Sequence, residues 1–325
     1  MANLNTSYLG LELNNPVIVS SSGLTASVDK LKQLEDYGAG AVVLKSLFEE
    51  QILYEAGSMS GDTDYPEAED YLFNYMRSHS VDEYLKLIRE AKAKLNIPVI
   101  ASINCISGSE WLDFTKKIQD AGADALEISV FFLPTDKNKG SEKHEKLYFD
   151  LAEKLPKIVS IPLVFKIGKN FTNPVYLVNR LYAYNIPGVV LFNRFYEPDI
   201  DIDHMRLSSA QVFSSPSDIR ESLRWVGIVS DKVPKIDISA STGNHDGKAV
   251  IKQILAGAQT VQVCSTLYRN GLQQLEFILE EIKQWMNKHD IQSLDDIRGK
   301  MSYKKIENPQ RYERAQFMKY FSNVY

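Results

Sequence analysis

Eight short apolar runs lie along the chain, and they are of two kinds that alternate strictly. Four begin with a proline, and they occupy residues 16–20, 98–102, 162–166 and 234–238. The other four begin with a glycine or with Pro-Gly, and they occupy residues 38–45, 122–129, 187–193 and 257–264. Short, nearly continuous apolar runs are typical of parallel strands buried on both faces. A proline at the start of a strand removes no ladder hydrogen bond, so both kinds of run predict strands.

Helical periodicity fills the gaps between these runs. Residues 80–95 place five apolar side chains on one helical face, namely Tyr84, Leu87, Ile88, Ala91 and Leu95. Residues 272–286 do the same with Leu275, Ile278, Leu279, Ile282 and Met286. Eight strands that alternate with helices predict an α/β fold of the (βα)8 TIM-barrel type, with a doubly wound open sheet as the alternative. The even number of strands and their strict alternation favour the barrel.

Three further segments complete the predicted architecture. Residues 8–13 alternate around a turn-like centre, which predicts an N-terminal hairpin that plugs the bottom of the barrel. Residues 47–79 form a long insertion after the second strand. We therefore expect a barrel domain over residues 1–300 and a C-terminal tail over residues 301–325. The tail carries several aromatic residues that predict packing on the barrel or on a partner subunit, namely Tyr312, Phe317, Tyr320 and Phe321.

Composition narrows the class of protein. The chain has 325 residues, of which 44% are hydrophobic and 24% charged, and its net charge is -5. That charge gives no attraction to nucleic acid or to an acidic membrane surface. The N-terminus has no signal-peptide pattern, and no apolar run approaches the roughly 18 residues of a membrane span. Cys105 and Cys264 lie far apart, which favours a reducing cytoplasm, and neither the cysteines nor the histidines have metal-site spacing.

The chemistry of a TIM barrel lies at the carboxyl ends of its strands, and here those ends are polar. The residues concerned are residues 20–23, Lys45, Asn104, Ser129, Lys166, Asn193, residues 239–243, Ser265 and Thr266. An ammonium group at a strand end is costly to desolvate unless a negative group meets it. Lys45 and Lys166 therefore predict an anionic or electron-rich ligand in the barrel mouth. A solvated lysine, or one paired with a carboxylate, is the alternative.

The turns after the seventh and eighth strands predict a phosphate site. They read Ser-Ala-Ser-Thr-Gly at residues 239–243 and Cys-Ser-Thr at residues 264–266. Barrels bind phosphate at this place with backbone N–H groups and a helix N-terminus, and Gly243 would let a phosphate approach the backbone. An ordinary turn with a helix cap is the alternative. A phosphate site with two lysines fits an FMN enzyme, and it also fits an aldolase that forms a lysine Schiff base with a sugar phosphate.

These strand ends resemble those of the dihydroorotate dehydrogenase family, especially its soluble members, over about residues 5–300. Residues 13–23 resemble the family's NP…ASG opening, and residues 44–46 resemble its (T/V)KS strand end. Residues 74–76 are similar to the start of its NxMG substrate loop, and residues 165–166 to its VK(L/I) strand. The remaining similarities are at Asn104, at Asn193, in the turns at residues 242–243 and 262–266, and in the closing HGK-like segment at residues 297–300.

The resemblance implies that FMN lies across the barrel mouth. Lys166 would contact the electron-rich N1/C2=O edge of the flavin and stabilise its reduced form. Lys45 would act between the flavin and a substrate carboxylate as a catalytic group. The other implied cofactor contacts are Ser22, Gly23, Asn104, Thr242, Gly243, Ser265 and Thr266, the last three around the phosphate.

The implied reaction is the oxidation of dihydroorotate to orotate in pyrimidine biosynthesis, and the implied assembly is a homodimer. Asn74, Met76, Ser129 and Asn193 would line the substrate site. Arg194 is an addition beside Asn193, and its guanidinium could hold a carboxylate or a phosphate in a bidentate manner. The substrate is then a small anion.

The chain departs from the family where the catalytic base is expected. The family's fourth strand ends in NxSxPN and leads to a loop that carries a cysteine or serine base. Here Ser129 replaces the asparagine and Phe132 falls at the base position. Phenylalanine accepts no proton, whereas the oxidation requires a base when hydride leaves for the flavin. We therefore expect a retained cofactor site and an altered substrate site, with Thr135, Asp136 and His79 as candidate acid/base groups.

Three functions remain open on the sequence. The leading one is an FMN-dependent oxidoreductase that acts on a dihydroorotate-like ring or another small anion. The second is a Schiff-base lyase of the aldolase type, with Lys166 or Lys45 as the nucleophile. The third is a flavin-binding subunit without turnover, which the missing base and the aromatic tail would suit.

Overall fold

A computed structural model describes residues 2–48, 66–104, 112–130, 133–209 and 211–314. Within helices, only the backbone is described for residues 66–79 and 112–113. All eight predicted apolar runs overlap a strand of one parallel sheet. The strands are β3 (Val17–Val19), β4 (Ala41–Val43), β6 (Val99–Asn104), β7 (Ala125–Ser129), β8 (Leu163–Ile167), β9 (Gly188–Leu191), β12 (Asp237–Ala240) and β13 (Thr260–Val263).

The sheet closes on itself. Each strand pairs in parallel with its neighbours in chain order, β13 pairs with β3, and β4 pairs with β6, so the ring contains eight strands. A short additional strand, β5 (Leu47–Phe48), extends the pairing along the outer end of β6. The prediction of a TIM barrel is therefore confirmed, and the open-sheet alternative is wrong.

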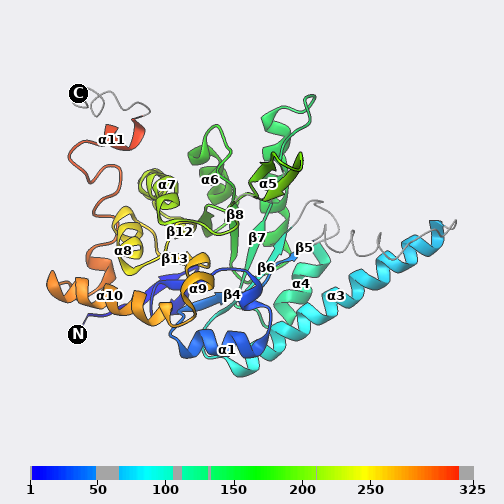
Figure 1. The fold of residues 1–325 in the computed structure, drawn as a ribbon, viewed down its shortest axis with the longest axis horizontal. Coiled ribbons are helices and arrows are strands. Elements are labelled where there is room, and N and C mark those ends of the chain that lie inside the picture. The colour runs from blue at the N-terminus through cyan, green and yellow to red at the C-terminus, as the bar shows by residue number, and fades with distance from the viewer. Residues whose placement is uncertain (1, 49–65, 105–111, 131–132, 210, 315–325) are drawn as a thin grey trace.

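Helices surround the strands (Figure 1). They are α1 (Val28–Asp36), α3 (Pro66–Lys94), α4 (Leu112–Asp120), α5 (Ser141–Lys154), α6 (Pro174–Ala183), α7 (Ile219–Lys232), α8 (Gly247–Ala256), α9 (Ser265–Asn270), α10 (Gln274–Lys288) and α11 (Gln310–Glu313). The predicted helix at residues 272–286 corresponds to α10. The predicted helix at residues 80–95 is the second half of α3, which begins at Pro66, so part of the expected insertion is helical.

The predicted N-terminal hairpin forms and closes the amino end of the barrel. Its strands are β1 (Thr6–Tyr8) and β2 (Leu11–Leu13), joined through Leu9 and Gly10, which both have positive φ. Two consecutive left-handed residues make the tight turn whose twist suits a β-hairpin. Tyr8, Leu9 and Leu13 pack on the lower lumen residues, which are Ile18, Ala41, Val43, Ile100, Ala125, Val164 and Val190. The backbone N–H of Leu9 also donates to Asp237 Oδ2 at 2.6 Å.

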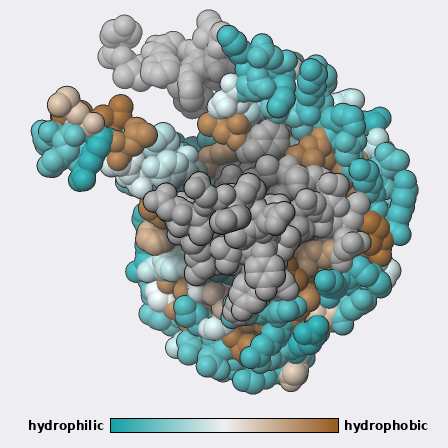
Figure 2. Space-filling model, turned by 90° about the vertical axis from the view of Figure 1, so that its right-hand side faces the viewer, coloured by the Kyte–Doolittle hydropathy of each residue, from teal (hydrophilic) through white to brown (hydrophobic). Residues whose placement is uncertain are grey.

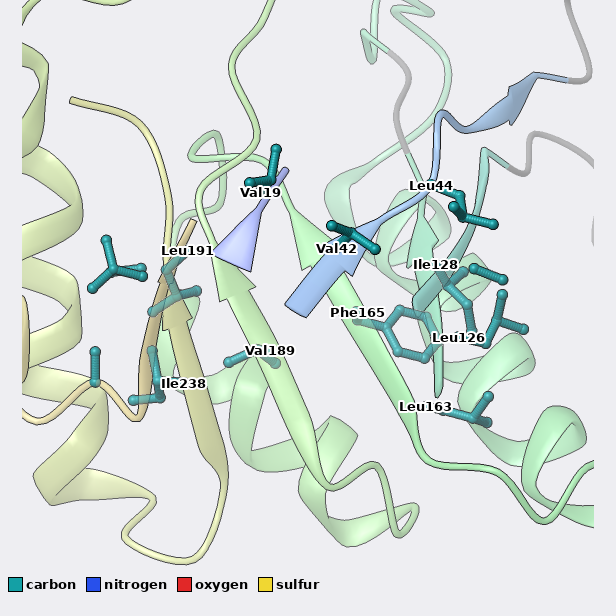
Figure 3. Close-up of a cluster of buried hydrophobic side chains, with 14 of the residues drawn as sticks. Val19, Val42, Leu44, Leu126, Ile128, Leu163, Phe165, Val189, Leu191 and Ile238 are labelled. Atoms are coloured by element: carbon teal, nitrogen blue, oxygen red, sulfur yellow. The ribbon is translucent and has the colours of Figure 1, made fainter. Parts of the chain in front are cut away.

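Alternation along each strand divides the side chains between the lumen and the helix layer. Outward positions such as Val19, Leu126 and Phe165 form the large apolar cluster under the helices (Figure 3). Inward positions are apolar at the hairpin end and polar toward the carboxyl ends of the strands. The buried inward polar residues toward the mouth include Ser20, Ser102, Asn104, Glu127, Ser129, Lys166, Ser239 and Gln262. The polar half of the lumen therefore faces the barrel mouth.

The start of the C-terminal tail lies against α7. The backbone N–H of Tyr303 donates to Gly227 O at 2.9 Å, and Tyr312 covers Gly227 so closely that a Cβ there would lie 2.5 Å from its ring. The Tyr312 hydroxyl donates to Met301 O at 2.6 Å. Phe317, Tyr320 and Phe321 lie outside the described residues. The division into a barrel domain and a tail stays a prediction.

A second hairpin is exposed. Its strands, β10 (Pro198–Asp201) and β11 (Arg206–Ser209), follow β9, and Ile200 pairs directly with Leu207 on one face. Those two side chains are 64% and 75% exposed, respectively. Elsewhere the described surface is mainly hydrophilic on the face that Figure 2 shows, with small separate hydrophobic patches.

The packing of Leu9 against Gly188 provides a test of the hairpin plug. A Cβ on Gly188 would lie 2.4 Å from Leu9 Cδ2. We expect Gly188→Ala to lower the free energy of unfolding by about 1–3 kcal/mol, because overpacking forces the neighbours to move. Urea unfolding of Gly188→Ala, Leu9→Ala and the double variant measures this. The double variant should lose less than the sum of the two single losses; simple additivity would contradict the contact.

Candidate functional site

A cavity of about 470 Å³ lies at the carboxyl ends of β3, β8, β9, β12 and β13, and we call it the mouth cavity. Its volume falls within the roughly 300–1,000 Å³ of small-molecule sites. The predicted site residues that line it are Lys166, Asn193, Arg194, Thr242, Gly243 and Ser265. Residues that the sequence did not single out also line it, namely Val212, Phe213, Ser214, Asn244 and Tyr268.

Lys166 lies at the floor of the mouth cavity within a polar network. Its Nζ lies 2.9 Å from Ser20 Oγ, 2.8 Å from Gln262 Oε1 and 3.3 Å from Glu127 Oε1. Gln262 Nε2 in turn donates to Glu127 Oε2 at 2.7 Å. The lysine is therefore paired with a carboxylate, which is the alternative that the sequence left open. Glu127 gave no sequence signal, because only the barrel closure brings β7, β8 and β13 around one lumen.

Lys45 lies elsewhere. Its neighbour Ser46 turns inward, where its Oγ lies 2.9 Å from Ser21 Oγ and 2.7 Å from Ser102 Oγ. Lys45 is consequently exposed and lines a different cavity, of about 710 Å³, between the start of α1 and α3. The expectation that Lys45 and Lys166 share the barrel mouth is thus not met in this structure. The reason is that regular strand alternation ends at Leu44, after the last residue of β4.

The turns after β12 and β13 meet at one end of the mouth cavity. Thr242 and Gly243 both have positive φ, and a Cβ on Gly243 would lie 2.1 Å from the backbone nitrogen of Ile219. Glycine is therefore required here by the close approach of α7, a different reason from the expected approach of a phosphate. Helix α9 begins beside this turn, and Ser265 Oγ accepts a hydrogen bond from the Ser214 N–H at 3.0 Å.

Two other predicted cofactor-binding residues use their hydroxyls within the fold. Thr266 is buried, donates to His245 O at 2.9 Å and accepts from Asn270 Nδ2. Thr242 Oγ1 donates to Phe192 O at 3.1 Å. Their backbone N–H groups, rather than their hydroxyls, are what such a turn would offer to a phosphate.

Aromatic side chains flank the entrance. The rings of Phe213 and Tyr268 stack with their centroids 5.2 Å apart, and both line the mouth cavity. The Tyr268 hydroxyl sits 2.9 Å from the place of a Cβ on Gly23, so Gly23 makes room for it. Ser22 caps the following 3-10 turn, η1 (Gly23–Thr25), and accepts from the Leu24 N–H. Ser22 and Gly23 thus shape the rim on the side of β3.

Asn193 and Arg194 follow β9 at the opposite side of the entrance. Both line the mouth cavity and also a neighbouring cavity of about 230 Å³. The guanidinium of Arg194 lies 3.3 Å from Asp218 Oδ2 and 3.3 Å from Glu197 Oε2, and it donates to Gln211 O at 2.8 Å. An anionic ligand would therefore have to compete with two carboxylates for Arg194.

Comparison with known proteins matches residues 3–286 to the family model "Dihydroorotate dehydrogenase". The chain belongs to the dihydroorotate dehydrogenase family. The family prediction made from the strand-end motifs is thereby confirmed.

Curated relatives agree with this assignment. The catalytic subunit of dihydroorotate dehydrogenase B (NAD(+)) of Thermoplasma acidophilum is 26% identical over 307 residues, which cover 92% of this chain and 99% of the relative. The corresponding subunit of Methanocaldococcus jannaschii is 26% identical over 91% of this chain and 97% of its own. Dihydroorotate dehydrogenase A (fumarate) of Lactobacillus helveticus is 24% identical over 93% and 100%. The chain is an oxidoreductase of the dihydroorotate dehydrogenase kind.

The base position of this family member is only partly described. Phe132 lies outside the described residues, as do the side chains of Asn74, Met76 and His79. Thr135 and Asp136 lie in an exposed loop after β7 that does not line the mouth cavity. The backbone N–H of Asn138 and the ammonium of Lys139 lower the pKa of Asp136, which makes its carboxylate a weaker base.

Asn104 and Ser129 end neighbouring strands at the mouth side of the lumen. They are paired residues of β6 and β7, and both are buried. Asn104 Oδ1 has no hydrogen-bond partner among the described residues. Burial also raises the pKa of the Cys264 thiol, which therefore stays protonated near neutral pH.

None of the described helices is long and apolar enough to cross a membrane. The described side chains include no cluster of three or more His, Cys, Asp or Glu suited to a metal ion.

His245 lies beside the turn at residues 239–243, and the pH dependence of folding stability tests its buried state. It is only 9% exposed, and its Nε2 lies 3.0 Å from Ser214 Oγ. Burial, followed by the charge of Arg269, lowers its pKa below 6.5. The unfolded chain then binds this proton more readily than the folded one, so folding stability falls as pH drops below about 6.5, by up to about 1.4 kcal/mol per pH unit.

We expect His245→Asn to remove most of this slope between pH 7.5 and 5.5. Urea unfolding of both proteins at several pH values measures it. His289→Asn makes the same side-chain change at an exposed position and serves as the comparison. Equal slopes for the wild type and His245→Asn would contradict a neutral, buried His245.

Proposed function

We propose that the mouth cavity binds FMN and that the protein is an FMN-dependent oxidoreductase acting on the CH–CH bond of dihydroorotate or a closely similar small anion. The observation that carries this proposal is one continuous cavity. Its floor holds Lys166 and the polar residues bonded to it, and at one end meet the turns after β12 and β13. FMN has groups that match both ends of the cavity. Its electron-rich ring edge can meet the lysine, its phosphate can meet the turns, and a ribityl chain joins the two.

The buried side chain of Asn244 shows whether the hydrogen-bonding groups of the cavity suit FMN. Its side chain is only 4% exposed, and its Nδ2 donates to Ala240 O and Gln262 O. Its Oδ1 has no partner among the described residues although it is buried, and the residue lines the mouth cavity. A buried acceptor needs a donor, and the ribityl hydroxyls of FMN are donors of the right kind. The residues present therefore fit the cofactor.

Each part of the site has a role under this proposal. Lys166 and Gln262 would meet the flavin ring, Asn244 the ribityl chain, and the backbone around Gly243 and Ser265 the phosphate. Bound FMN would supply the hydride-accepting chemistry that the side chains lack. Asn193, at the opposite rim, would hydrogen-bond the substrate.

The catalytic roles of Lys45, Thr135 and Asp136 remain predictions. Lys45 is exposed in the cavity between α1 and α3, and Asp136 is an exposed ion-pair partner of Lys139, 3.4 Å away. Neither placement supports direct contact with a ligand in the mouth cavity. Ser21 does line that cavity, and its Oγ lies 2.9 Å from Ser46 Oγ.

The Schiff-base alternative gains no support from the described residues. A lysine nucleophile must attack as a free amine. Lys166 Nζ is surrounded by three oxygen acceptors, one of them a carboxylate, and these contacts would have to break before the nitrogen could attack a carbonyl carbon. Borohydride trapping with keto-acids should accordingly yield no adduct at Lys166.

A visible absorption spectrum before and after anaerobic addition of dihydroorotate tests the proposal. We expect a flavin spectrum that loses its band when dihydroorotate is added. A flavin band that persists would keep the cofactor and exclude this substrate, in favour of another substrate or a subunit without turnover. A colourless protein that takes up no added FMN would overturn the proposal.

Asn193 should separate substrate binding from cofactor binding. We expect Asn193→Ala to keep the flavin spectrum and to slow bleaching by dihydroorotate by roughly 10- to 100-fold, because one substrate hydrogen bond is lost. Stopped-flow absorbance measures the rate. Asn287→Ala, on the exposed face of α10, is the control and should bleach like the wild type. An unchanged rate in Asn193→Ala would remove Asn193 from the substrate site.

We further propose a cytoplasmic homodimer, which the resemblance to soluble family members implies. Two relatives are named catalytic subunits, so those proteins assemble with other chains. The exposed pair Ile200 and Leu207 supports a contact through the β10–β11 hairpin, because alternating apolar strand positions are usually covered.

Mass in solution tests the dimer. Ile200→Asp combined with Leu207→Asp should shift the wild-type dimer to a monomer, because two charges would be buried at the contact. Ser208→Asp adds a charge on the opposite face of the same hairpin and should leave the dimer intact. A wild-type protein that is monomeric at all concentrations would contradict the assembly.

A further inference from the structure

The floor of the mouth cavity contains an ion pair that is almost fully buried. Glu127 is 1% exposed and Lys166 is 6% exposed, and their Nζ–Oε1 distance is 3.3 Å. Gln262 bridges the two charges, since its Oε1 accepts from Lys166 and its Nε2 donates to Glu127 Oε2. Lys166 and Gln262 line the cavity, while Glu127 lies on the side of the pair away from it.

The hydrogen-bonding capacity of Lys166 is fully used. An ammonium group has three N–H donors. Three acceptors surround this one, namely Ser20 Oγ, Gln262 Oε1 and Glu127 Oε1. A ligand can contact Nζ only by sharing or displacing one of them. Ser20 and Gln262 are the two that line the cavity, so the link to Glu127 is the one that a ligand would leave in place.

The Glu127–Lys166 ion pair also determines the net charge at the floor of the mouth cavity. A lone lysine would attract the negative charge that reduction adds to a bound flavin. A carboxylate 3.3 Å from the ammonium opposes that attraction, and in a buried site the opposition is weakly screened. The negative charge of Glu127 is felt across the lumen, because it adds to burial in raising the pKa of Tyr8 from the hairpin and of Tyr84 from α3.

We propose that Glu127 is a positioning residue that holds Lys166 at the floor and cancels its charge, so that the cavity offers the flavin a hydrogen-bond donor on an electrically neutral floor. This inference rests on the proposed FMN site and deepens it. It differs from the expectation that Lys166 acts as a positive charge that stabilises the reduced flavin. The protein would thus hold its flavin at a potential that two opposite charges set together.

The reduction potential of the bound flavin is the deciding measurement, made on the wild type, Glu127→Gln, Lys166→Met and the double variant. We expect Glu127→Gln to raise the potential, with reduced flavin binding favoured over oxidised flavin by roughly tenfold, since one opposing charge is removed. Lys166→Met should lower it. The double variant should return close to the wild type. Glu153→Gln, the same change on the exposed face of α5, is the control and should leave the potential unchanged.

Two results would overturn the inference. If Lys166 acts as an uncompensated cation, Glu127→Gln leaves the potential unchanged, and the double variant is as low as Lys166→Met. If Glu127→Gln does not fold, the double variant still decides between these cases, because it buries no lone charge.

Unfolding of the FMN-free proteins separates this inference from the proposed function. Each single variant leaves one buried charge without its partner and should lower the melting temperature, and the double variant should recover most of the loss. Losses that simply add would refute the pairing. A wild type that binds no FMN would sink the proposed function, while this cycle would still decide whether Glu127 neutralises Lys166.

Discussion

Closure of the eight-stranded sheet is the constraint on which the rest of this molecule depends. Once β4 pairs with β6 and β13 with β3, every second residue of each strand points into a closed lumen. The amino half of that lumen is filled by Tyr8, Leu9 and Leu13 of the hairpin. In the carboxyl half, Ser20, Glu127, Lys166 and Gln262 satisfy one another by hydrogen bonds, because unpaired buried polar groups are costly.

The network around Lys166 follows from this constraint. A buried ion pair recovers its desolvation cost only when further hydrogen bonds complete it. Gln262 provides them by donating to the carboxylate and accepting from the ammonium, and Ser20 adds a third acceptor. Glu127, Lys166 and Gln262 lie on β7, β8 and β13, and Ser20 directly follows β3, so the network exists only in the closed barrel. It also holds the lysine ammonium at the floor of the mouth cavity.

The mouth shows how neighbouring elements, and not only ligands, determine residue types. Gly243 has the positive φ and the small size that a phosphate turn requires, yet the atom nearest its missing side chain belongs to the backbone of α7. Thr266 has a hydroxyl suited to a phosphate, but that hydroxyl bonds to His245 O. At both positions the residue supports the geometry of its turn. These turns leave backbone N–H groups at the end of the cavity.

The sequence by itself determined the fold, because strand length, alternation and turn residues are local properties that survive in a linear chain. All eight strands, the hairpin and the family could be predicted from apolar runs, glycines, prolines and strand-end motifs. The sequence also identified Lys166, Asn193 and Gly243, which do line one cavity. Only the tertiary structure decided that Lys45 turns away while Ser46 turns in, and that Glu127 meets Lys166 from the next strand. The first outcome depends on where the inward and outward alternation of side chains ends, and the second on which strands become neighbours in the barrel. The residue spacing within a single segment predicts neither.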